Sequence, residues 1–257
     1  MGKQERVVEI DRMDHPIASR IFLNAKLQEI YWIVAEAVAR MDEYVIIPEL
    51  RQREWCHIAE ALAYDFPQFF YWKDWETIQY ESYSVNGRKS KKIRFIYFYD
   101  KETACHKMRK IEQEASRIIS QCIYGKKTER EKIYAIHSYL ASNLRYTDKK
   151  KVDEKGMYPD YSYTLESLIR GDGVCRGLSA VNIFLLRKLQ IECASVASEN
   201  HAWNIIKLRT GEIYFSDIAW DTHHVGDYQY FMLTEEEMRA VEHHKTTGLY
   251  PERMMGG

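Results

Sequence analysis

Residues 171–221 have the sequence GDGVCRGLSAVNIFLLRKLQIECASVASENHAWNIIKLRTGEIYFSDIAWD. A cysteine, a histidine and an aspartate follow one another in this stretch, at Cys175, His201 and Asp217. A thiol, an imidazole and a carboxylate are the nucleophile, base and orienting group that covalent cysteine chemistry requires. The sequence therefore predicts a catalytic site made of Cys175, His201 and Asp217.

Cys175 is predicted to lie at the start of a helix. Asp172 and Gly173 are a turn and N-cap signal, and an apolar-periodic run over residues 178–189 follows them. The unpaired N–H groups and the positive dipole end of a helix N-terminus favour an anion, which lowers the pKa of a cysteine there. Gly177 leaves room beside the sulfur for a substrate or for another backbone segment.

Three strands are predicted to follow this helix, over residues 191–197, 201–208 and 212–218. Thr210 and Gly211 indicate a hairpin turn between the last two. A loop over residues 209–211 would pair Leu208 with Glu212.

In that register Asp217 and Asp221 lie on the two diagonals from His201, within reach of a longer side chain. Geometry alone does not choose between the two carboxylates. The strand position of Asp217 favours it as the partner of His201.

The segments GDGVCRG, HAWNIIKL and IYFSDIAWD together resemble the transglutaminase-like superfamily of cysteine enzymes, in its compact bacterial form. The resemblance covers residues 130–240 and departs from the family pattern at Leu178, Ser216 and Ala219. It implies a papain-like thiol mechanism in which Cys175 is the nucleophile, His201 the base and Asp217 the orienting group. It also implies that the region before the cysteine forms one wall of the active cleft. A tyrosine there, among Tyr158, Tyr161 and Tyr163, either donates to an oxyanion or only packs.

The whole chain is expected to have an α+β fold with a papain/transglutaminase-like core. In that core a helix bearing Cys175 packs on an antiparallel sheet bearing His201 and Asp217. We expect an N-terminal helical region with a β-hairpin over residues 1–125 and a catalytic domain over residues 126–257. Periodicity and turn signals predict further helices over 17–41, 49–64 and 101–122 and after Thr128 and Thr234, hairpin strands over 77–84 and 92–99, and a last strand over 230–233.

Composition narrows the classes of partner. The 257 residues are 46% hydrophobic with a net charge of −1, which gives no electrostatic reason to bind nucleic acid or an anionic membrane. No apolar run is long enough for a signal peptide or a membrane span. Five cysteines without framework spacing favour a reduced, cytoplasmic setting. The resemblance to the transglutaminase-like superfamily implies a peptide or protein substrate. The sequence leaves the oligomeric state open.

Other residues have simpler interpretations. The other four cysteines are predicted to be small core residues: Cys56, Cys105, Cys122 and Cys193. His223 and His224 are expected in a solvated loop. No C-x-x-C or H-E-x-x-H spacing occurs, so neither a metal nor another cofactor is expected. An aromatic run, comprising Phe66, Phe69, Phe70, Tyr71, Trp72 and Trp75, forms either a core cluster or a wall of the substrate cleft.

The leading hypothesis is acyl-transfer chemistry on an amide or ester carbonyl, with hydrolysis favoured over cross-linking. A protein-glutamine acyl transferase is the closest alternative, because only the final acceptor differs. An arylamine N-acetyltransferase uses the same order of residues, but its cysteine lies near the chain start, whereas Cys175 is past the middle. A non-catalytic peptide-binding module with the same fold is the alternative from another class, since a fold does not fix a function.

Overall fold

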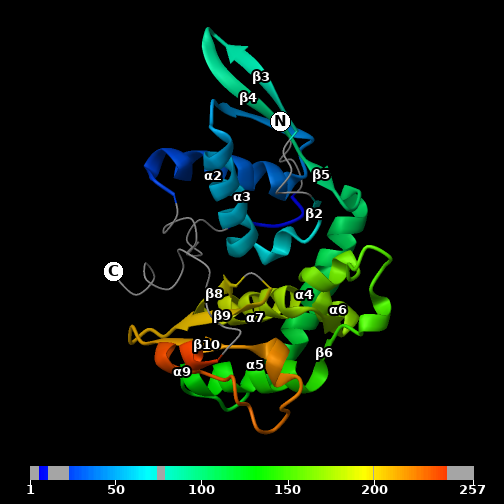
Figure 1. The fold of residues 1–257 in the computed structure, drawn as a ribbon, viewed down its shortest axis with the longest axis vertical. Helices are drawn as coiled ribbons and strands as arrows, with labels where there is room; N and C mark the ends of the chain where they lie inside the picture. The colour runs from blue at the N-terminus through cyan, green and yellow to red at the C-terminus, as the bar shows by residue number, and fades with distance from the viewer. Residues whose placement is uncertain (1–5, 11–22, 74–78, 199, 242–257) are drawn as a thin grey trace. The chain divides into compact units, whose positions relative to one another are not determined.

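The computed structural model describes residues 6–10, 23–73, 79–198 and 200–241, and it shows a chain of mixed helix and sheet (Figure 1). Its internal contacts divide the chain into two compact units, residues 1–108 and 109–257. This division falls inside helix α4 (Lys101–Ile123), seventeen residues before the predicted boundary after residue 125. Within the described residues, no helix is both long and apolar enough to cross a membrane.

The first unit combines helices with a three-stranded sheet and a two-stranded sheet. Its elements are α2 (Ala25–Arg40), β1 (Tyr44–Pro48), α3 (Gln52–Asp65), η1 (Pro67–Phe69), β2 (Trp72–Lys73), β3 (Gln79–Val85), β4 (Arg88–Arg94) and β5 (Ile96–Tyr97). Strand β1, which the sequence did not predict because Pro48 indicated a break, pairs antiparallel with β4. The hairpin β3–β4 closes through Asn86 and Gly87, both at positive φ, so the connection has two residues rather than the longer one predicted.

The described part of the aromatic run lies in the core of this unit. The five buried side chains are Phe66, Phe69, Phe70, Tyr71 and Trp72. Phe66 stacks on Phe69 with ring centroids 4.7 Å apart, and Trp72 meets Phe95 edge-on at 5.9 Å. These contacts favour the core interpretation over a cleft wall. Trp75 lies outside the described residues.

The second unit places a long helix on a three-stranded sheet. Its elements after α4 are α5 (Glu129–Asn143), β6 (Arg145–Tyr146), η2 (Lys149–Lys151), η3 (Asp160–Tyr163), α6 (Ser167–Arg170), β7 (Asp172–Gly173), α7 (Cys175–Lys188), β8 (Glu192–Ala197), β9 (Ala202–Lys207), β10 (Ile213–Ser216), α8 (Ile218–Asp221) and α9 (Glu235–Ala240). The sheet has the order β10-β9-β8 and is antiparallel throughout. Helix α7 packs against β8 and β9, and α5 and α8 pack against α7.

The predicted register of the β9–β10 hairpin is confirmed. Lys207 pairs with Ile213 and Asn204 with Ser216, and the Leu208 N–H donates to the Glu212 carbonyl at 2.9 Å. The predicted strand over residues 230–233 is wrong, because among the described residues this segment contributes only a single bridge, from Leu233 to Phe215.

Helix α5 begins as predicted, with a capping box in which Thr128 and Glu131 satisfy each other's backbone N–H groups. The polar segment after α5 is less irregular than expected. Arg145 and Tyr146 form strand β6, which pairs in parallel with Asp172 and Gly173 of β7. This pairing brings the chain directly after α5 alongside the residues that lead into α7.

A buried polar network joins α7 to the sheet. The Asn182 side-chain amide donates to Oδ1 of Asn204 at 2.9 Å, and the Asn204 amide donates to Oγ of Ser179 at 2.8 Å. All three side chains are buried, so each bond satisfies a group that water cannot reach. The network fixes how far along β9 the helix sits, and therefore where the first residue of α7 lies.

Candidate active site

Cys175 is the first residue of α7. The N-cap is Val174, not Asp172 or Gly173, and it offers no side-chain cap. Asp172 instead lies in β7, where its carboxylate accepts hydrogen bonds from Lys151 and Tyr161. The predicted helix start is confirmed one residue later than the capping signal suggested.

Position 177 requires glycine because another backbone segment packs closely against it, and not because a substrate needs the room. A Cβ at Gly177 would lie 2.2 Å from the Ser162 carbonyl oxygen and 2.4 Å from Ser167 Oγ. The Ser162 carbonyl also accepts the Val174 N–H at 2.9 Å. The segment before α6 thus packs directly against the first turn of α7, and any side chain at position 177 would push it away.

His201 lies immediately before β9, with its ring between two tryptophans. The ring stacks on Trp203 at 5.8 Å and lies tilted against Trp220 at 5.5 Å. Its Nε2 is 2.5 Å from Oδ2 of Asp217. The thiol of Cys175 also has a hydrogen bond to the His201 side chain, and because Nε2 is engaged with Asp217, Nδ1 is the nitrogen left for the sulfur.

Asp217 lies just after β10 and not on the strand, which corrects the reason for choosing it. It is the N-cap of α8, and its Oδ1 accepts the Trp220 N–H at 3.0 Å while Oδ2 faces His201. The carboxylate is fully buried. One oxygen thus fixes the short helix and the other meets the imidazole.

Asp221, the competing carboxylate, has a different histidine. Its Oδ2 is 2.7 Å from Nε2 of His137, a residue of α5 that no sequence pattern singles out. Both side chains are buried. The structure therefore separates the two aspartates, which strand register alone does not.

The electrostatics of the thiol and the imidazole are linked. Burial is the largest single influence on the Cys175 thiol, and by itself it would raise the pKa of the thiol. The hydrogen bond and charge of His201, together with the N–H of Ala202, outweigh burial. The pKa of the Cys175 thiol is therefore lowered. Burial works to lower the pKa of His201, but its bonds to Asp217 and Cys175 raise that pKa to about 9. The two shifts favour a thiolate beside an imidazolium.

Tyr146 is the neighbour of the cysteine that sequence reasoning missed. Its hydroxyl bonds both the backbone N–H and the side chain of Cys175, and burial, followed by the nearby thiol, raises the pKa of the phenol. Two of the tyrosines considered from the sequence are engaged elsewhere: the Tyr161 hydroxyl donates to Asp172 and the Tyr163 hydroxyl accepts the Tyr158 N–H. The third, Tyr158, packs its ring edge-on against Tyr146 at 6.4 Å. Only the β6–β7 pairing brings Tyr146 to the thiol, and two-residue strands leave almost no pattern in a sequence.

The remaining cysteines differ in exposure. Cys193 is buried and its burial raises the pKa of its thiol to about 12, whereas Cys105 and Cys122 are half-buried. Cys56 is exposed on α3, so its predicted place in the core is wrong. Among the described residues, no cluster of histidine, cysteine, aspartate or glutamate side chains is arranged to hold a metal.

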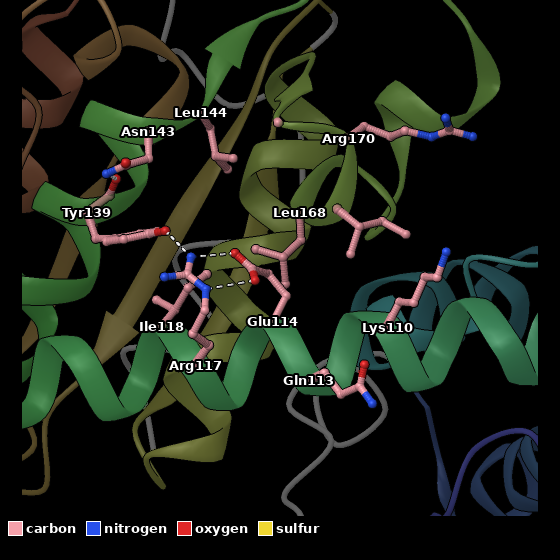
Figure 2. A pocket seen from close by; sticks show the side chains of 12 residues that line it. Lys110, Gln113, Glu114, Arg117, Ile118, Tyr139, Asn143, Leu144, Leu168 and Arg170 are labelled. Atoms are coloured by element: carbon pink, nitrogen blue, oxygen red, sulfur yellow. Dashed lines mark hydrogen bonds and ion pairs between the residues drawn. The ribbon is translucent and has the colours of Figure 1, made fainter.

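A cavity of about 600 Å³ lies between α4, α5 and α6 (Figure 2). Arg117 points into it from α4 and is held by both oxygens of Glu114 and by the hydroxyl of Tyr139. The apolar part of the lining includes Leu144 and Leu168. The charges of Arg117 and Glu114 in this cavity therefore already satisfy each other.

A family comparison is consistent with this geometry. Residues 116–225, which include Cys175, His201 and Asp217, match the model of the transglutaminase-like superfamily. This part of the chain is therefore similar to that superfamily. The transglutaminase-like segment thus begins within α4 and ends after α8.

Two solved structures are distant likenesses. One, described as a TGase, is 15% identical with a TM-score of 0.38, over 68% of this chain and 50% of the other. The second, from Parabacteroides distasonis ATCC 8503 and described provisionally as a protease, is 12% identical with a TM-score of 0.32, over 54% of this chain and 35% of the other. The chain thus spans half or less of the length of either protein. A comparison with curated proteins gives no match.

Proposed function

We propose that this protein is a transglutaminase-like cysteine hydrolase that cleaves an amide or ester bond in a peptide or protein. The observation that carries the proposal is the contiguous hydrogen-bonded series from Cys175 through His201 to Asp217. A thiol activated by a histidine, which is itself oriented by a carboxylate, is the arrangement of nucleophilic acyl transfer.

In the first step the Cys175 thiolate attacks the carbonyl carbon and a tetrahedral intermediate forms. The His201 imidazolium gives its proton to the leaving amine or alcohol, and the C–N or C–O bond breaks to leave a thioester. His201, now neutral, takes a proton from water, whose oxygen attacks the thioester. The C–S bond then breaks, the acid is released, and the proton on His201 restores the ion pair.

The negative oxygen of each intermediate needs donors. The backbone N–H of Cys175 is one, and the Tyr146 hydroxyl lies beside it. We assign the Tyr146 hydroxyl as the second donor, because a tyrosine phenol is protonated at neutral pH and can donate its O–H. A substrate carbonyl oxygen that lies between the two groups would receive a hydrogen bond from each, in place of the bond that they now make to each other.

Labelling with iodoacetamide over a pH series, read by mass spectrometry, tests the nucleophile without knowledge of the substrate. Cys175 should react at mildly acidic pH, where an ordinary thiol is almost fully protonated. Exposed Cys56 is the matched control on the same molecule, and Cys175→Ala identifies the labelled site. If Cys175 reacts no faster than Cys56 under these conditions, the proposed function is wrong.

The acceptor of the acyl group needs a second experiment. Water is favoured by the resemblance to the compact bacterial form, and a peptide library can be incubated with the enzyme in the presence and absence of a fluorescent primary amine. Hydrolysis predicts shortened or deamidated peptides in both samples. Transfer of the amine to glutamine side chains, with little hydrolysis, would replace the hydrolase assignment by the protein-glutamine acyl transferase.

A further inference from the structure

A second histidine–aspartate pair lies behind the candidate catalytic pair. Helix α8 has four residues, with Asp217 as its N-cap and Asp221 as its last residue. Asp217 bonds His201, and Asp221 bonds His137 at 2.7 Å. One short helix therefore carries the carboxylates of both pairs.

The inner pair is enclosed by the protein. The ring of His137 meets Tyr228 at 5.3 Å and Phe231 at 4.9 Å, both edge-on. Its second nitrogen, Nδ1, is buried, and no hydrogen-bond partner for it is found among the described residues. Because both side chains of the pair are buried, the pair is not arranged to exchange protons with a substrate.

The two carboxylates are joined through the backbone of one residue. The Tyr230 N–H donates to both oxygens of Asp221, at 3.2 and 3.3 Å, and the Tyr230 carbonyl accepts the Asp217 N–H at 2.8 Å. Trp220 adds a second link, since its ring packs edge-on against Tyr230 at 4.9 Å and also contacts His201. A shift of Asp221 would therefore move the groups that orient His201.

We propose that His137 is a positioning residue: it holds Asp221 at the end of α8 so that Asp217, at its start, keeps its carboxylate on His201. The assignment rests on the proposed function, because it has meaning only if His201 activates Cys175. The competing explanation is that the inner pair only stabilises the fold. The two explanations differ in whether a folded protein without the pair keeps a reactive thiol.

The test compares folded variants by the pH series of Cys175 alkylation with iodoacetamide. His137→Leu alone leaves a buried carboxylate without its partner and is expected to unfold easily. The double variant His137→Leu with Asp221→Asn removes that unpaired charge and keeps an acceptor for the Tyr230 N–H, so it should fold. His201, Asp217 and Tyr146, the groups that interact with the thiol, are unchanged in it.

In the double variant we expect alkylation at mildly acidic pH to slow about 10- to 100-fold, since a displacement of about 1 Å at a site can cost about 100-fold. The pH at which the alkylation rate of Cys175 rises should also increase, because a less well oriented His201 stabilises the thiolate less. His137→Gln, whose amide nitrogen can replace Nε2, should stay near the wild type, whereas the shorter His137→Asn should resemble the double variant.

Two outcomes overturn the assignment and can be told apart. The first outcome is a wild-type alkylation profile in the folded double variant. If the double variant does not fold, His137→Asn takes its place in this comparison. A wild-type profile would mean that His137 serves only the fold, and the proposed function would stand. If wild-type Cys175 itself reacts no faster than Cys56, the proposed function fails and the role of His137 fails with it.

Discussion

The outer pair, His201–Asp217, and the inner pair, His137–Asp221, use the same two side-chain types at similar distances, 2.5 and 2.7 Å. They differ in access and in what the second ring nitrogen meets. The His201 side chain is 10% exposed and lies against a thiol. The His137 side chain is 1% exposed, and its Nδ1 meets no hydrogen-bond partner within the part of the chain that the structure describes. A histidine–aspartate pair is thus not a catalytic signature by itself. The third group and the route to solvent make the difference.

Asparagine in place of each aspartate should separate the pairs most strongly. Asp217→Asn should reduce kcat about 10⁴-fold, because an amide holds the imidazole in the wrong tautomer, as in the serine-protease case where the same change was made. Asparagine caps helices as well as aspartate does, so α8 should remain folded. Asp221→Asn should lose less activity but lower the melting temperature more, because it weakens a fully buried pair.

Steady-state rates and thermal melts of the two variants provide the measurement, with a substrate from the peptide screen. Equal losses of kcat in both variants would contradict the assignment of the outer pair as the catalytic one. A wild-type melting temperature for Asp221→Asn would contradict the claim that the inner pair stabilises the fold.

Tyr146→Phe should have the next largest effect. Loss of one oxyanion donor costs about 10²–10³-fold in kcat, and phenylalanine keeps the ring that packs near Tyr158. KM should change little, because the oxygen gains its charge only in the transition state. Tyr161→Phe, which breaks the bond to Asp172 instead, is the matched control. A drop in kcat for the control as large as that for Tyr146→Phe would remove the oxyanion assignment.

The pH profile of kcat/KM reports the outer pair directly. The lowered pKa of Cys175 places the acid limb below the ordinary thiol value of 9.0, since activity requires the thiolate. Above a pH of about 9, His201 loses the proton that the leaving group needs, so activity should fall. The fall is expected to be about tenfold per pH unit. In Asp217→Asn the alkaline limb should move to lower pH, because the bond to Asp217 is the main cause that raises the His201 pKa. An alkaline limb that does not move would show that another group sets it.

The smallest effect is expected at the start of α5, the helix that carries His137. Thr128→Ala removes the helix N-cap and should cost about 1 kcal/mol of unfolding free energy. Denaturant unfolding measures that loss, and the alkylation profile of Cys175 should not change. This variant separates general loosening of α5 from the loss of His137. A shifted alkylation profile in Thr128→Ala would mean that any destabilisation of α5 disturbs the thiol.

Much of this architecture follows from local sequence patterns. The helix bearing Cys175, the capping box at Thr128 and the register of the β9–β10 hairpin depend on neighbours within a few residues, and the structure confirms them. Apolar periodicity and turn residues encode such features directly.

The parts that could not be predicted depend on distant pairings. Tyr146 reaches the thiol only through a two-residue parallel pairing, and His137 meets Asp221 across 84 positions in the chain. Neither contact leaves a periodic pattern in the sequence. The sequence predicts a strand position for Asp217, but β10 ends one residue earlier and the carboxylate caps α8.

The amide network between Asn182, Asn204 and Ser179 has a consequence for redesign of this protein. These groups leave little freedom for α7 to slide along β9, because a displaced helix would leave several buried polar atoms without their hydrogen-bond partners at once. Apolar substitutions around them can alter the melting temperature while the spacing between sulfur and imidazole stays the same. A designer who wishes to widen that spacing, for a bulkier nucleophile at position 175, would have to exchange Asn182 and Asn204 together.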